Sequence, residues 1–427
     1  MVTSLAENNN KELEKEQELL AKYDKESAYR QALGKWGWIV AVIAISMTFF
    51  HLYTAFVGPY RSMIQGAIHV GAGLALIFLL YPVKRTLIQR PGVAWYDIVL
   101  AGLALYVNFY LVWNYERLTT RAIVFGFETI DIIVATLGIV LVLEGTRRAV
   151  GLPIVIIASA ALAYGVWGQG IPHFGHAGFD WSVLSVRMYF SSSAIFGTPI
   201  QISSTFIFLF LFFGVMLVHT GIGKFFNDLA FRATGKYTGG TGKAAVTASA
   251  LQGMVTGSSV ANTVASGSFT IPMMKRAGFR PEFAAASEAS ASTGGQIMPP
   301  IMGAAAFIMA EYTGTPYSQI IIIAIIPALL YFSGVMMGVH FEAKKHNILG
   351  LPKEQLPPIK GLLKKLDLIL PLVAIIGILL AGYTPTFAGL AGIATAFIVS
   401  FFRKDTRLGF WKILYVLEQG ARVALPV

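Results

Sequence analysis

Cysteine is absent from this chain of 427 residues, which excludes disulfide bonds and thiolate metal sites. Charged residues are also scarce: they make up 13% of the sequence, whereas soluble domains have about a quarter. The chain is instead 55% hydrophobic, with many apolar runs of about 20 residues, the length that crosses a hydrocarbon core of about 30 Å. This composition predicts an all-α polytopic membrane protein embedded in a lipid bilayer.

The net charge of +11 would by itself suggest a nucleic-acid partner. Its distribution argues against one, because nearly all Lys and Arg fall in loops on one side when successive apolar spans alternate across the membrane. We therefore expect no nucleic acid and a cytoplasmic N-terminus. The expected spans cover residues 36–57, 63–82, 95–113, 122–144, 152–168, 202–220, 318–341, 366–383 and 385–402.

Composition divides the chain into three parts. Residues 1–35 form a polar, mixed-charge arm, expected on the cytoplasmic side. Further along, the segment EGTRRAVGLP around Gly151 combines charge, glycine and proline and marks the best domain boundary. It separates a four-span unit at 36–150 from a second unit at 151–427.

The apolar segment 244–274 does not fit a simple crossing. Lys243 precedes it, and Lys275 and Arg276 follow it, so both ends should face the cytoplasm. As one helix it would measure about 46 Å, and two full crossings would need roughly 40 residues. We therefore predict a re-entrant hairpin whose tip, TGSSVANTVASG, reaches the middle of the membrane.

A second unusual segment, 283–312, has the length of one crossing but contains STGGQIMPP in its middle. Glycine weakens a helix, and proline removes a backbone donor and clashes with the preceding turn. We expect a broken span: two half-helices with unwound backbone between them. At membrane depth such backbone is tolerated only where it lines a cavity or is buried in protein.

A hairpin beside a broken helix is a common way for secondary transporters to build a site at the membrane midplane. Half-helix N-termini attract carboxylates, while carbonyl, hydroxyl and amide oxygens hold small hard cations. The expected oxygen donors are Ser258, Ser259, Asn262 and Thr263 in the hairpin and Thr293, Gly294, Gly295 and Gln296 in the broken span. The alternative is that the small residues at 257, 258, 261 and 265 only permit close helix packing.

The stretch 256–314 closely resembles the large membrane subunit of tripartite ATP-independent periplasmic (TRAP) transporters. Its GSS-x-A-x-T pattern at 257–263 and GG-x-x-x-PP pattern at 294–300 carry the resemblance, which extends over about 151–427. The four-span unit is similar by its span count to the small subunit. The chain therefore resembles the fused type, in which both subunits form one polypeptide.

This resemblance implies symport of a small organic acid, such as a C4-dicarboxylate, driven by an ion gradient that is usually sodium. It implies an elevator-like movement of the transport unit against the four-span scaffold, in the plasma (inner) membrane of a bacterium or archaeon. A separate extracytoplasmic binding protein would deliver the organic anion, and no cofactor other than the coupling ion is expected. The family's cation sites match Ser258, Ser259, Asn262, Gly294 and Pro299. For the substrate and the hairpin tip we expect Thr263, Thr293, Gly295 and Gln296.

Two features depart from the common pattern. GGQIM replaces a leucine, glycine and isoleucine run before the prolines, and SEAS and STGGQ resemble the branch served by the TAXI class of binding protein, of which some members use protons. Sodium and proton therefore both stay open, with Glu288 as the candidate proton site and a water-exposed or paired acid as its alternative. The chain also reaches only the first of the inverted repeats expected of such folds, so we expect a C-terminally incomplete product containing half of the transport unit.

Other functions have weaker support. A membrane enzyme would need a nucleophile–base pair, and Ser258 has no histidine or lysine placed to activate it, so no catalytic residues are expected. A non-transporting scaffold or a channel stays as the alternative. Glu128 and Asp131, three residues apart in the fourth span, are functional candidates as intramembrane acids, but pairing with Arg117 or Arg121 is the favoured interpretation.

Overall fold

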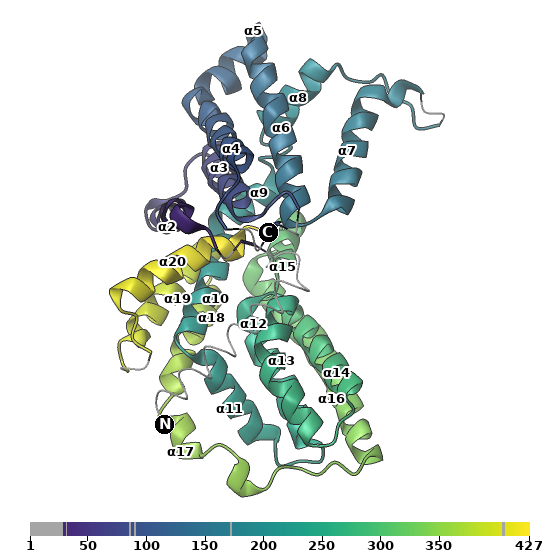
Figure 1. The fold of residues 1–427 in the computed structure, drawn as a ribbon, viewed down its shortest axis with the longest axis vertical. Coiled ribbons are helices and arrows are strands. Elements are labelled where there is room, and N and C mark those ends of the chain that lie inside the picture. The colour runs from purple at the N-terminus through teal and green to yellow at the C-terminus, as the bar shows by residue number, and fades with distance from the viewer. Residues whose placement is uncertain (1–28, 31, 85–86, 89–90, 171–172, 404–405) are drawn as a thin grey trace. The chain divides into compact units, whose positions relative to one another are not determined.

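The computed structural model describes residues 29–427 except 31, 85–86, 89–90, 171–172 and 404–405. Within these residues the regular structure is entirely helical, which confirms the predicted all-α class (Figure 1). Most of the predicted N-terminal arm, residues 1–28, lies outside the described residues. The described chain divides into two compact units, one formed by residues 29–208 with Leu417–Val427 and the other by Leu209–Val416.

In the described part of the chain, 7 helices are long and apolar enough to cross a membrane. They correspond to predicted spans, and two further predicted spans near the C-terminus are shorter apolar helices, Leu366–Leu380 and Pro385–Ser400. The 7 long helices are Gly34–Val57, Ser62–Leu80, Trp95–Trp113, Thr129–Ala149, Leu152–Gly170, Thr198–His219 and Tyr317–Lys345.

The unit of residues 29–208 is centred on α3 (Ser62–Leu80), which is the most buried of its apolar helices. Gly71 of α3 faces Asn108 of the next long helix so closely that a Cβ at Gly71 would lie 2.9 Å from the Asn108 Cβ. The longer helices of this unit, besides α3, are α2 (Gly37–Val57), α4 (Trp95–Trp113), α6 (Thr129–Ala149), α7 (Leu152–Trp167) and α8 (Trp181–Tyr189). The short elements are η1 (Gly34–Trp36), η3 (Arg117–Arg121), α5 (Ala122–Phe125), η4 (Gly168–Gly170), α9 (Thr198–Ile202) and η5 (Ser203–Ile207).

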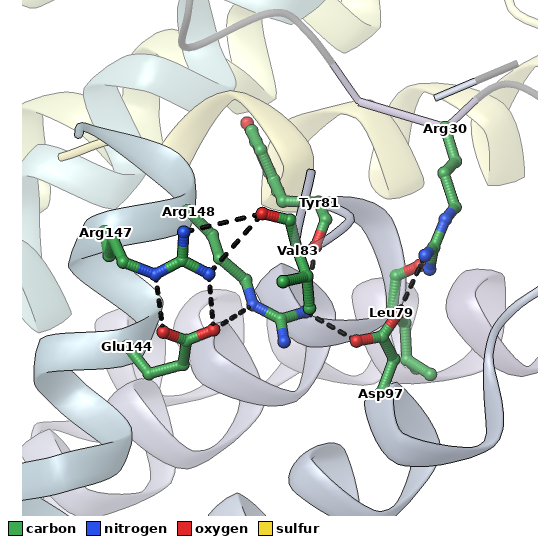
Figure 2. Close-up of polar contacts among 8 residues, drawn as sticks. All are labelled: Arg30, Leu79, Tyr81, Val83, Asp97, Glu144, Arg147 and Arg148. Atoms are coloured by element: carbon green, nitrogen blue, oxygen red, sulfur yellow. Dashed lines mark hydrogen bonds and ion pairs between the residues drawn. The ribbon is translucent and has the colours of Figure 1, made fainter. Parts of the chain in front are cut away.

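A buried ion cluster ties the N-terminal segment of this unit to α4 and α6 (Figure 2). The carboxylate of Asp97 on α4 lies 2.7 Å from a guanidinium nitrogen of Arg30 and 2.7 Å from one of Arg148 on α6. Arg148 also pairs with Glu144, which in turn holds Arg147. Because the Asp97 and Arg148 side chains are shielded from solvent, each charge depends on its partner for stability.

The fourth span begins later than predicted, at Thr129 rather than at 122. Gly126 leaves the helical region with φ +94°, and Glu128 and Asp131 then form a reciprocal capping box that starts α6. Arg117 lies 2.6 Å from Asp131 and 3.4 Å from Glu128, so the expected pairing of these acids is confirmed. Hydrogen bonding to Asp131 raises the pKa of the Arg117 guanidinium.

The unit of residues 209–416 contains the two unusual segments. Its helices are α10 (Phe208–His219), α11 (Ile222–Thr234), α12 (Gly240–Thr256), α13 (Ser259–Arg276), α14 (Pro281–Gly294), η6 (Gly295–Ile297), α15 (Ala304–Thr313), α16 (Tyr317–Lys345), η7 (Lys353–Gln355), α17 (Ile359–Leu363), η8 (Leu366–Ile369), α18 (Leu370–Leu380) and α19 (Pro385–Ser400), followed by the start of α20 (Phe410–Ala424). An apolar core between α12, α13, α14 and α16 includes Val246, Met274, Ala291 and Val339. This shared core packs the hairpin, α12 and α13, against α14 and α16.

The sequence boundary near Gly151 falls inside the unit of residues 29–208. Gly151 has φ +133° and precedes α7, where a residue with a side chain would be strained. The domain division at 150 stays a prediction.

Candidate functional site

Helices α12 and α13 form a tight antiparallel hairpin (Figure 1). Gly257 turns the chain with φ +64°, and a Cβ there would also lie 2.7 Å from the Met302 carbonyl oxygen, so glycine serves two purposes. Ser258 then caps α13 by accepting a hydrogen bond from the Ala261 amide. The chain reverses at Gly257 and Ser258, so Asn262 lies inside the first turns of α13 rather than at the turn itself.

The second segment is interrupted as its glycines and prolines predict. Helix α14 ends at Gly294, η6 adds a single tight turn, and the non-helical backbone 298–303 precedes α15. The Gly303 amide donates to the Gln296 carbonyl at 2.7 Å and closes this loop. The hydroxyl of Tyr317, on α16, contacts the Ile301 carbonyl at 2.5 Å and holds the loop from the other side.

The hairpin and the interruption touch through two glycines. A Cβ on Gly253 would lie 2.6 Å from the Gly295 Cα, and a Cβ on Gly295 would lie 2.6 Å from the Gly253 Cα. Alongside, the Gln296 side-chain amide donates to the Ser259 hydroxyl at 3.3 Å. The two segments that the sequence singled out are therefore in direct backbone contact.

Three oxygen atoms in the hairpin are buried without a hydrogen-bond partner among the described residues: Thr241 Oγ1 near its start, and Thr256 Oγ1 and Asn262 Oδ1 near the turn. The orientation of the Asn262 amide is determined by its nitrogen, which donates to the Ser249 carbonyl at 2.8 Å. Its oxygen therefore points away from Ser249 and keeps its lone pairs available. Neutral oxygens of this kind are ligands for a small hard cation.

The remaining candidates differ in how they are placed. The hydroxyls of Thr263 and Thr293 each donate to a carbonyl one turn earlier in their own helix. Gly294 faces α16, where a Cβ would lie 2.4 Å from the Tyr331 ring, so Gly295 and not Gly294 meets the hairpin. Pro299 is half-buried in the loop.

Glu288 lies inside the protein, between α13 and α14, with 1% of its surface exposed. Its carboxyl oxygens contact the hydroxyls of Ser266, Thr270 at 2.7 Å and Ser292 at 3.3 Å. Within the described residues no Lys, Arg or His forms an ion pair with it. The alternative of a water-exposed or paired acid is therefore wrong.

Sequence reasoning missed the hydroxyls around Glu288. Asn262, Ser266 and Thr270 follow one another at intervals of four, which places all three on one face of α13. Glu288 and Ser292 are also four apart on α14. This spacing was the available signal, because two polar faces at helical period inside an apolar chain indicate a shared polar interface.

Residues 137–427 match the family model of the DctM component of the tripartite ATP-independent periplasmic transporter. The chain belongs to this family. The DctM match begins within α6, so the expected large-subunit resemblance is confirmed and reaches further back than residue 151. With its apolar helices, the family places the chain among multi-pass membrane proteins.

Individual DctM-type relatives agree with this assignment. The chain is 29% identical over 202 residues to the C4-dicarboxylate TRAP transporter large permease protein DctM of Pseudomonas aeruginosa, with 47% of each chain covered. It is 28% identical over 213 residues to the 2,3-diketo-L-gulonate TRAP transporter large permease protein YiaN of Escherichia coli, covering 48% of this chain and 49% of that protein. It is 28% identical over 183 residues to the sialic acid TRAP transporter large permease protein SiaM of Vibrio cholerae, covering 42% of each. The chain thus spans about half the length of the curated relatives it matches.

Proposed function

We propose that this chain is the membrane permease component of an ion-gradient-driven symporter for small organic acids. The names of the relatives support an acidic substrate, because C4-dicarboxylates, diketogulonate and sialic acid all carry a carboxylate. By the resemblance of its first spans, the chain is of the fused type with the small subunit included. The SEAS and STGGQ motifs around Glu288 favour the branch served by a TAXI-class binding protein.

The observation that carries the proposal is the contact between Gly253 and Gly295 beside the unpartnered oxygen of Asn262. This donor set fits sodium, which binds neutral oxygens and must also be released. Asn262 supplies the clearest ligand, and Ser258, Ser259, Gly294 and Pro299 complete the proposed cation site. A bound cation would supply positive charge beside the substrate carboxylate.

The proposed substrate site lies next to the cation site. Thr293 and Gln296 are exposed, and Thr263 and Gly295 lie on the facing elements, so an anion approaching them meets the N-terminal end of α13. A helix N-terminus carries about half a positive elementary charge and favours a carboxylate. Cation and anion would therefore lie side by side, at the start of α13 and the interruption after α14.

The proposed placement in the membrane follows from the charges. Lys243 begins and Lys275 and Arg276 end the hairpin, so both ends of α12–α13 face the cytoplasm and the Gly257 turn points into the membrane. The N-terminus is proposed to be cytoplasmic and the membrane to be the plasma (inner) membrane. An extracytoplasmic binding protein delivers the substrate, and the hairpin unit moves against the four-span scaffold.

Proton coupling is the second candidate function, and the burial of Glu288 favours it. A carboxyl group that is enclosed by hydroxyls can exchange a proton without an arginine or lysine partner. A channel or non-transporting scaffold is the remaining alternative. A channel would show flux without saturation, and a non-transporting scaffold would show no flux.

The test is uptake into vesicles by the complete transport system with its binding protein, with the sodium and proton gradients varied separately. Saturable uptake that requires one of the two gradients supports symport, and uptake that needs neither contradicts it. Asn262→Ala should abolish the sodium dependence. Asn114→Ala removes an amide that bonds only the Tyr110 carbonyl and Arg117, in the other unit, and it should leave uptake unchanged.

A further inference from the structure

A chain of buried hydrogen bonds connects Asn262 to Glu288. The Asn262 amide nitrogen donates to the Ser249 hydroxyl at 3.0 Å, and the hydroxyls of Ser249 and Ser292 are 2.8 Å apart. Ser292 contacts Glu288 Oε1 at 3.3 Å. All four side chains are almost completely buried, so water does not compete for these bonds.

The chain has a direction. The amide nitrogen of Asn262 can only donate, so Ser249 accepts from it and uses its single hydrogen toward Ser292. Ser292 in turn donates to Glu288. Every hydrogen therefore points toward Glu288, the arrangement that an ionised carboxylate requires.

The same surroundings also satisfy a protonated Glu288. Ser266 can donate to the Asn262 carbonyl at 2.8 Å instead of to Glu288, and Thr270 can donate to the Ser266 carbonyl at 3.0 Å. Either hydroxyl then accepts the carboxylic acid proton. Both protonation states keep all their hydrogen bonds through rotation of hydroxyls, without movement of the helices.

The elements packed around Glu288 offer no competing charge at this point. The hydroxyls of Ser266 and Thr270 face it from α13, and that of Ser292 faces it from its own helix, α14. Ser249 of α12 contacts Ser292. On α16 the titratable Tyr331 bonds the Ser290 carbonyl instead. Apart from Tyr317 at the start of α16, which bonds the Ile301 carbonyl, the other ionisable residues of these helices are placed toward their cytoplasmic ends, by the charge rule above. They are Lys243, Lys275, Arg276, Glu282, His340, Glu342, Lys344 and Lys345.

We propose that a proton on Glu288 and a cation at Asn262 oppose each other, and that Ser249 and Ser292 link the two sites. This inference rests on the proposed cation site, and Glu288 contacts none of the proposed cation ligands. With Glu288 ionised, its charge attracts the cation and the aligned hydrogen bonds polarise the Asn262 amide, which strengthens its oxygen as a ligand. Protonation removes both effects. By thermodynamic linkage, the cation must lower proton affinity by the same factor.

The test uses the purified full chain in weakly buffered detergent solution, with NaCl compared with KCl at equal ionic strength. We expect sodium to release protons, detected with a pH indicator, and its half-saturation to tighten roughly tenfold between about pH 6 and about pH 8. The infrared band of a protonated carboxyl should fade as sodium binds. Neither readout depends on transport.

Variants separate the linkage from the site. Glu288→Gln should release no protons and bind sodium roughly tenfold more weakly than the parent at about pH 8, without pH dependence. The combined change Ser249→Ala and Ser292→Ala should keep sodium binding but reduce the pH shift to less than about twofold. Ser287→Ala, a matched control whose hydroxyl bonds the Ala284 carbonyl, should behave like the parent.

Sodium binding with one affinity at every pH would overturn the linkage and leave the proposed cation site standing. Absence of sodium binding at any pH would overturn the cation site and the linkage together. A pH shift that persists in the double serine variant would show that through-space attraction alone couples the sites, and the proposed role of Ser249 and Ser292 would be wrong.

Discussion

The contact between Gly253 and Gly295 is the geometric requirement of the proposed site, and Gly253→Ala tests it. The new Cβ would lie 2.6 Å from the Gly295 Cα and 3.1 Å from the Asn262 amide nitrogen. Favourable carbon–carbon contacts are about 3.5–4.0 Å, so the two backbones must separate by about 1 Å. The change therefore pushes apart the two segments that carry the proposed ligands.

The magnitude follows from two opposing effects. Overpacking of this kind costs about 1–3 kcal/mol, while replacing glycine by alanine inside a helix contributes about 0.5–1 kcal/mol of stability. Gly334→Ala on α16 is a matched control, because a Cβ there has no atom within 4 Å. The helix effect is common to both variants, so their free energies of unfolding should differ by about the overpacking cost alone.

The assay is unfolding of the purified chain by a denaturing detergent, with and without sodium. Gly334→Ala should be as stable as the parent or slightly more so, and Gly253→Ala should be less stable and should lose the stabilisation by sodium. Equal stability of the two variants would show that the glycines are not in contact. A destabilised Gly253→Ala that still responds fully to sodium would show that their contact does not shape the cation site.

Further predictions concern the polar contacts outside this site. Asp97→Asn removes the charge shared by two buried arginines and should cost about 3–5 kcal/mol in the same unfolding assay; a cost below about 1 kcal/mol would mean that the cluster is hydrated. Asp131→Asn should cost less than half as much, because Arg117 is 29% exposed and can turn to water. Tyr317→Phe should cost about 1–2 kcal/mol and speed hydrogen exchange of the Gly303 amide, because the loop loses its hydroxyl support; unchanged exchange there would contradict this.

The membrane spans and the helix break were predictable because their causes are local. Apolar length determines where a helix can cross, and the residues around Pro299 interrupt a helix wherever they occur. The late start of α6 was equally local, since Glu128 and Asp131 have capping-box spacing, but the apolar run from 122 obscured it. The hairpin turn was predicted a few residues too late, because Gly257, the residue that tolerates φ +64°, outweighs the polar residues that follow.

Sequence alone thus determined the class of the protein, its apolar spans and the two places where the chain departs from a simple helix, since hydropathy, glycine and proline act on their own neighbourhoods. Only the tertiary structure decided that Gly253 meets Gly295, that Asn262 turns its oxygen away from Ser249, and that Glu288 is enclosed by hydroxyls. Gly253 and Gly295 are 42 positions apart, and Ser249 and Asn262 are 13 apart. Glu288 is 22 positions from Ser266. These relations depend on how α12, α13 and α14 pack against one another, which no single helix encodes.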